Sequence, residues 1–241
     1  MTPPASIGGR IGLASLLLVL AAGPLGAYEV VTVTEGGTIE GRVTYEGRVP
    51  VKRIIPTKDK EVCGEPRDQA EIRVGPDKAV QDAVVYLKGV TKGKAWGPLD
   101  TVPVLDNKSC QFVPAIQVIR TGAIAIHNSD PVLHNTRAFY GRRTAFNVAL
   151  PNLGDQVTQE LPRPGVVRVE CDAHGWMLAH VFVADNPYYA LTGEDGGFRI
   201  TDIPPGDYAL VATQSYTGDS ETPVALKGGE TLTLPIELKR R

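Results

Sequence analysis

Residues 168–183 read RVECDAHGWMLAHVFV, and they place a Cys-x2-His-x2-Met motif between two strand-like runs. The runs are GVVRVE (165–170) and LAHVFVA (178–184), and their β-branched residues favour strands. Cys171, His174 and Met177 therefore lie on one short loop. Upstream, the stretch IHNSDPVLHNTRAF (126–139) offers His134 as a fourth candidate from a second loop.

A thiolate, two imidazoles and a thioether are the ligands of a blue-copper site. Sulfur ligands suit Cu(I), imidazole suits both oxidation states, and a weak axial thioether tunes the potential. A buried Cys or Met is more often only a packing residue, but the spacing of the motif favours metal binding. We therefore expect one type 1 copper per chain, held by His134, Cys171, His174 and Met177. Zinc fits less well, because structural zinc sites usually use more than one Cys.

The other two histidines, His127 and His180, lie inside alternating runs and are predicted to be strand-surface residues rather than ligands. Trp176 lies between two candidate ligands, where it would either shield the metal or simply pack.

The segment from about 105 to 185 resembles a cupredoxin of the plastocyanin and amicyanin kind. Its opening CQFVPAIQVIRTG (110–122) is similar to the Phe-x-Pro strand of those proteins, and AIAIHNSDPVLHN (123–135) follows with a His-Asn pair. The resemblance implies a Greek-key β-sandwich, the same four ligands, and Asn135 as the residue that ties the two ligand loops together. The two residues between His174 and Met177 resemble the short loop of amicyanin. The resemblance also implies that electrons pass through an exposed edge of His174, framed by the apolar residues 131–133.

Composition favours an all-β protein of one large or two small domains. The 241 residues include 26 Gly and 19 Pro, with short Val/Ile-rich runs between them. Helix is expected to be scarce, and RRTAFNVALPN (142–152) is predicted to be a loop and a short strand. The formal charge of −2 gives no basic field for binding nucleic acid.

The sequence after the copper motif resembles half of a carboxypeptidase regulatory-like domain, which is a transthyretin-like β-sandwich. The stretch YYALTGEDGGFRITDIPPGDYALVAT (188–213) contains its Gly-x-Phe strand, Pro-Gly turn and Tyr-x-Leu strand. The stretch TLTLPIEL (231–238) would be an edge strand, because Pro235 cannot donate a ladder hydrogen bond.

The other half of that domain is expected near the N-terminus, in GTIEGRVTYEGRVP (37–50) and VQDAVVYLKGV (80–90), with a polar, turn-rich segment (51–79) between them. The predicted units are N-terminal strands (37–98), a cupredoxin domain (99–187) and a regulatory-like portion (188–238). Either the two flanking parts form one sandwich split by the cupredoxin, or a decorated cupredoxin precedes an independent C-terminal module. A two- or three-stranded piece barely buries a core alone, which favours the split arrangement.

The N-terminus predicts export. Arg10 precedes the apolar run IGLASLLLVLAA (11–22) and the small-residue stretch GPLGA (23–27), as in a secretory signal peptide (1–27) cleaved after Ala27. The alternative is an uncleaved anchor. An exported protein permits disulfides, and Cys171 is reserved for metal, so we predict a Cys63–Cys110 disulfide. Two free thiols are the alternative.

These features predict a periplasmic, monomeric type 1 copper protein that passes single electrons between redox protein partners. No nucleic-acid partner is expected. The protein would contact a membrane only if its N-terminal segment stays uncleaved. The sequence contains no G-x-S-x-G, H-E-x-x-H or Gly-rich phosphate loop, so no enzyme is expected. With only two spare histidines, a multicopper oxidase or nitrite reductase is not favoured. The alternative is an exported β-sandwich binding or structural module whose metal site is residual or captures copper.

Overall fold

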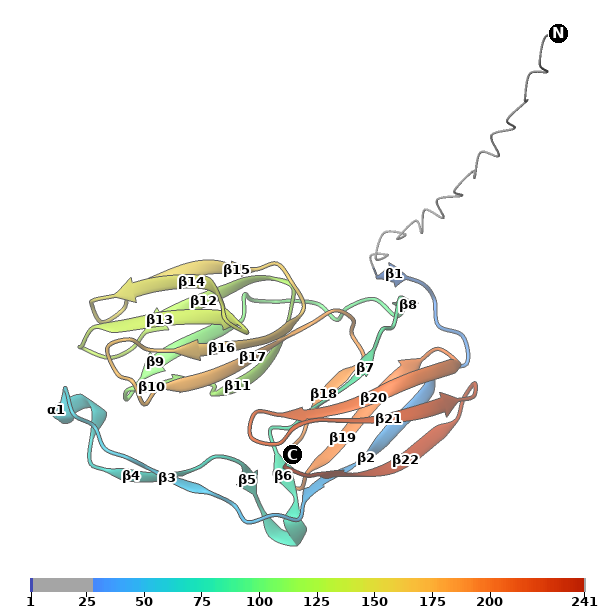
Figure 1. Cartoon of the computed structure of the whole chain (residues 1–241), viewed down its shortest axis with the longest axis horizontal. Helices are drawn as coiled ribbons and strands as arrows, with labels where there is room; N and C mark the ends of the chain where they lie inside the picture. Colours follow the sequence, from blue (N-terminus) through green and yellow to red (C-terminus); the bar gives the residue numbers. More distant parts are fainter. Residues whose placement is uncertain (2–27, 241) are drawn as a thin grey trace.

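The computed structural model describes Met1 and residues 28–240, which form an almost entirely β protein (Figure 1). Within that range, helix is limited to α1 (Lys60–Cys63) and the 3-10 turn η1 (Pro76–Lys78). No helix in the described part is long and apolar enough to cross a membrane. Apart from Met1, the predicted signal peptide lies outside the described residues.

The strands between residues 104 and 184 form a two-sheet sandwich, here called the inner sandwich. Its core holds large apolar side chains of both sheets, among them Leu105, Ile124 and Val181. The four-stranded sheet has the order β10 (Gln111–Val113), β9 (Val104–Lys108), β12 (Gly122–Asn128), β15 (Gln156–Leu161). The five-stranded sheet has the order β11 (Ile116–Arg120), β17 (Leu178–Ala184), β16 (Gly165–Glu170), β13 (His134–Tyr140), β14 (Arg143–Leu150).

Strands from both ends of the chain form a second sandwich, the outer sandwich. One sheet has the order β18 (Tyr189–Leu191), β7 (Val84–Lys88), β20 (Gly206–Gln214), β21 (Gly218–Leu226). The other has the order β19 (Gly197–Ile203), β2 (Gly37–Tyr45), β22 (Thr231–Leu238). The N-terminal strand β2 thus pairs with C-terminal strands on both sides, and β7 does the same. This is the pairing that a split sandwich requires, with the inner sandwich inserted between its halves.

Three short pairs complete the fold. β1 (Glu29–Val30) pairs with β8 (Lys92–Gly93), and β5 (Arg73–Val74) pairs with β6 (Val80–Gln81). β3 (Val51–Ile54) pairs antiparallel with β4 (Arg67–Ala70), and α1 lies at the tip of this ribbon. The segment from 51 to 70, called the arm below, extends from the outer sandwich toward one end of the inner sandwich (Figure 1).

Two local predictions have different outcomes. The segment 142–152 contains an eight-residue strand, β14, so the prediction of a loop and a short strand was wrong. The reason is that β14 pairs with β13 along its whole length, and this long-range pairing outweighs the weak local pattern. The final strand β22 lies at the edge of its sheet, which confirms the interpretation of Pro235.

A small apolar contact joins the two sandwiches. Val84 of the outer sandwich is buried in one cluster with Phe182 and Ala184 of the inner sandwich. The rings of Tyr86 and Phe182 lie 4.7 Å apart, within the range of favourable aromatic pairs. The strands that meet here are β7 and the end of β17, where the chain returns to the outer sandwich.

We predict that ending the chain after residue 186 unfolds the N-terminal strands but spares the inner sandwich. Such a truncation removes both partners of β2 and both partners of β7. Hydrogen exchange should therefore lose its protection in residues 37–45 and 84–88 and keep it in residues 116–184. Full protection of the N-terminal strands in the truncated chain would mean that the two parts of the outer sandwich are independent.

Candidate metal centre

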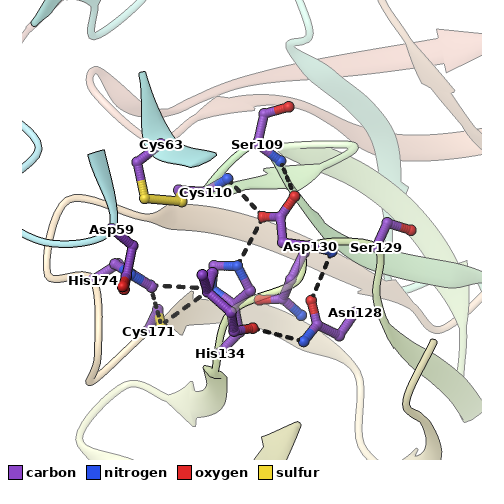
Figure 2. A network of polar contacts seen from close by, with 12 residues as sticks. Asp59, Cys63, Ser109, Cys110, Asn128, Ser129, Asp130, His134, Cys171 and His174 are labelled. Carbon is purple, nitrogen blue, oxygen red and sulfur yellow. Dashed lines mark hydrogen bonds and ion pairs between the residues drawn. A yellow bond between two sulfur atoms is a disulfide. The ribbon is translucent and has the colours of Figure 1, made fainter. Parts of the chain in front are cut away.

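Three of the four predicted ligands meet at one end of the inner sandwich. His134 is the first residue of β13, Cys171 follows the last residue of β16, and His174 lies in the loop that leads to β17. The Nδ1 atoms of the two histidines are 3.1 Å apart, and Cys171 Sγ lies 3.9 Å from His134 Nδ1 and 3.8 Å from His174 Nδ1. Figure 2 shows both rings and the sulfur turned toward one another.

The donor triangle fits a metal ion. A point equidistant from the two nitrogens and the sulfur lies roughly 2 Å from each, which is a metal–ligand distance. All three side chains are buried. A trigonal His2Cys arrangement is the one found at blue-copper centres. This donor set therefore suits copper better than a hard cation, which prefers oxygen ligands.

Asn135 connects the two loops that carry the donors. Its backbone N–H donates to Cys171 Sγ at 3.4 Å, and its side-chain Oδ1 accepts the N–H of Asp172 at 3.3 Å. These contacts confirm the predicted tying role of Asn135. An N–H donor to the sulfur stabilises the thiolate, the form that binds metal.

A buried carboxylate that the sequence analysis did not identify holds His134. Asp130 Oδ2 lies 2.8 Å from His134 Nε2, and the same carboxylate accepts the backbone N–H groups of Ser109 and Cys110 at 2.7 and 2.9 Å. Burial lowers the pKa of His134 below its ordinary value, against the opposing effect of Asp130. The neutral ring, which is the form that ligates metals, is thereby favoured.

His174 is completely enclosed. Its side chain is 0% exposed, Asp59 Oδ2 lies 2.9 Å from its Nε2, and the Trp176 ring centroid is 5.1 Å away. The prediction of an exposed His174 edge as the electron port was therefore wrong. The arm brings Asp59 from 115 residues earlier in the chain onto this edge, a contact that a local loop pattern cannot reveal.

The fourth predicted ligand, Met177, lies on the loop between β16 and β17 that also carries His174. Its side chain is 3% exposed and packs in the core of the inner sandwich, as Cys171 does. Its backbone N–H donates to the carbonyl of His174 at 2.9 Å, which closes a tight turn. His127 and His180 lie in β12 and β17, half-buried, and belong to none of the close donor groups among the described residues.

The predicted disulfide is confirmed. Cys63, at the end of α1, is bonded to Cys110 with a Cα–Cα distance of 4.9 Å, while Cys171 is free and buried. A donor atom from each of Cys63, Cys110 and His174 lies within 4.8 Å of the others, so the disulfide packs directly beside the centre (Figure 2). Trp176 Nε1 donates to the carbonyl of Cys110 at 3.3 Å, which ties the ligand loop to the same point.

Comparisons with known proteins give structural likenesses only. No protein-family model matches the sequence, and no curated protein matches it. The purple cupredoxin of Nitrosopumilus maritimus is 23% identical over 34% of this chain and 99% of its own, with a TM-score of 0.31. Amicyanin from Paracoccus versutus is 16% identical over 36% of this chain and 85% of its own, with a TM-score of 0.32. A Cu-containing nitrite reductase from Thermus scotoductus is 18% identical over 38% of this chain and 24% of its own, with a TM-score of 0.31.

Proposed function

We propose that the inner sandwich is a cupredoxin-like domain that holds one type 1 copper ion and carries single electrons between redox proteins. His134, Cys171, His174 and Met177 would hold the ion, with the Met177 thioether as the weakest of the four donors. The observation that carries the proposal is the buried triangle of two Nδ1 atoms and one Sγ, which has the size of a metal site.

The surroundings support electron transfer rather than catalysis. When bound, copper would supply a one-electron couple between Cu(I) and Cu(II). The protein's part is to hold the donors in one arrangement: Asp130 fixes His134, Asn135 fixes the two loops, and burial excludes water. Such fixed ligands need little rearrangement when the electron arrives or leaves.

The rest of the chain has a supporting role in this proposal. We take the outer sandwich to be a regulatory-like, transthyretin-type scaffold that can dock a partner. The Cys63–Cys110 disulfide supports an oxidising compartment, in keeping with export to the periplasm. The electron donor and acceptor would be redox proteins, and the chain itself a monomer.

A copper titration tests the proposal. Metal-free protein with one equivalent of Cu(II) should develop intense visible absorption that saturates at one ion per chain, because the Cys171 thiolate binds the oxidised ion. Addition of a one-electron reductant should bleach the colour, and reoxidation should restore it. A protein that stays colourless with Cu(II) would instead support the copper-capture or structural module.

A further inference from the structure

The arm is fixed against the metal centre at its tip. Its ribbon, β3 and β4, is mostly exposed, and α1 at its end carries Cys63, which is bonded to Cys110. Cys63 and the half-buried Val62 belong to the core of the inner sandwich rather than to that of the outer sandwich from which the arm extends. The arm is therefore a segment of one sandwich that is anchored in the other.

Asp59, just before α1, makes the arm's contact with the centre. Its carboxylate is 2.9 Å from His174 Nε2 and 39% exposed, whereas His174 is 0% exposed. The backbone of Asp59 is left-handed, with φ 47° and ψ 42°. A non-glycine residue in this region marks a backbone held by its surroundings, although Asp and Asn tolerate it better than most residues.

The contact has a definite chemical consequence for His174. Nδ1 faces the other two donors, so the ring proton belongs on Nε2, where it is donated to Asp59. A carboxylate on the far nitrogen of a metal-bound histidine fixes its tautomer and ring orientation and makes it a stronger donor. The carboxylate's negative charge also favours the more highly charged oxidation state of a nearby ion.

The same arrangement occurs at His134, whose Nε2 faces Asp130. The two carboxylates differ in origin. Asp130 lies four residues before His134 and is almost fully buried, whereas Asp59 comes from outside the inner sandwich and retains access to water. Only the Asp59 contact depends on the arm, so it can be removed without altering the inner sandwich.

We propose that Asp59 is a positioning residue of the metal centre, supplied by the disulfide-anchored arm, which orients His174 and stabilises Cu(II) relative to Cu(I). This inference rests on the proposed copper function. It assigns a role to the arm, part of a polar, turn-rich segment for which neither resemblance implies a function.

The test compares three substitutions at one position with a control on the same helical turn. Asp59→Asn removes the charge and keeps both an acceptor oxygen and tolerance of the left-handed backbone. Asp59→Gly removes the whole side chain and suits the same backbone. Asp59→Glu keeps the carboxylate on a side chain that is one methylene longer. The matched control is Glu61→Gln, which removes an exposed carboxylate from the first turn of α1.

Loss of such a partner usually lowers metal affinity by about 10- to 100-fold. Because the lost negative charge favoured Cu(II), we expect the ratio of Cu(II) to Cu(I) affinity in Asp59→Asn to fall about tenfold. That change corresponds to a rise in reduction potential of about 59 mV for one electron. Asp59→Glu should recover most of the wild-type potential, and Glu61→Gln should match the wild type. An Asp59→Asn potential equal to that of the control would overturn the proposal.

A second measurement uses the metal-free protein. Nitrogen-15 NMR of the imidazole rings should find His174 protonated on Nε2 in the wild type and as a mixture of tautomers in Asp59→Gly. Identical His174 spectra in the two proteins would also overturn the positioning role. If the wild type binds no copper, the proposed function fails, and the NMR comparison still decides whether Asp59 holds His174.

Discussion

Cys171→Ser should abolish the intense visible absorption of the copper-loaded protein. The colour of a blue-copper centre arises from the bond between Cu(II) and a thiolate, and Cys171 is the free cysteine of the described chain. A serine hydroxyl is a harder, far less acidic ligand, so a Cu(II) ion bound by the remaining histidines would be nearly colourless.

The spectrum should be recorded with one equivalent of Cu(II) against two references, the wild type and His180→Gln. His180 lies on β17 outside the donor triangle, so its replacement should leave the colour unchanged. Unfolding midpoints close to that of the wild type would show that both variants are folded. Full colour in a folded Cys171→Ser protein would contradict the ligand assignment.

Removing the disulfide is expected to have the largest effect on stability. The bond closes a sequence separation of 47 residues, and the loop-entropy relation gives about 4 kcal/mol for a loop of that length. The double variant Cys63→Ser with Cys110→Ser should lower the free energy of unfolding by about that amount. The arm tip should also detach and uncover His174, because the disulfide anchors the helix that follows Asp59.

Urea unfolding of the metal-free proteins measures the free energy, and hydrogen exchange over residues 51–70 follows the arm. The reference for both measurements is the wild type kept under non-reducing conditions. Thiol counting should find one free thiol per wild-type chain, that of Cys171, which shows that the disulfide is intact. A double variant as stable as the wild type, with the arm still protected, would show that the packing of Val62 and Asp59 suffices to hold the arm.

The parts of the centre that the sequence predicts are those encoded within short segments. Cys171 and His174 are three residues apart on one loop, and the spacing alone brings them together. The role of Asn135 is implied by the resemblance of its His-Asn pair to that of cupredoxins. The Cys63–Cys110 disulfide follows from an odd cysteine count, because the metal motif accounts for the third thiol.

Contacts between distant segments are what the sequence does not reveal. Asp130 precedes His134 by four residues, but a carboxylate at that spacing has no pattern that distinguishes it from a solvated turn residue. Asp59 approaches His174 only because a polar ribbon folds across to the other sandwich, and no periodicity encodes that path. The predicted disulfide did carry information about this contact. It places residue 63 beside residue 110, and therefore places Asp59, four residues before Cys63, near the same end of the inner sandwich.

The interlaced topology of the two sandwiches has a consequence for the order in which they form. Strands from 104 to 184 contain every strand partner that the two sheets of the inner sandwich need, so this part can fold as soon as residue 184 has been synthesised and released. The outer sandwich must wait, because residues 38–45 of β2 pair with β22, the last strand in the chain order. Until their C-terminal partners follow, β2 and β7 are unpaired strands, a state in which edges invite association with other chains. The early bond between Cys63 and Cys110 would keep the polar arm beside the finished inner sandwich during that interval and shorten the search that brings the two ends together.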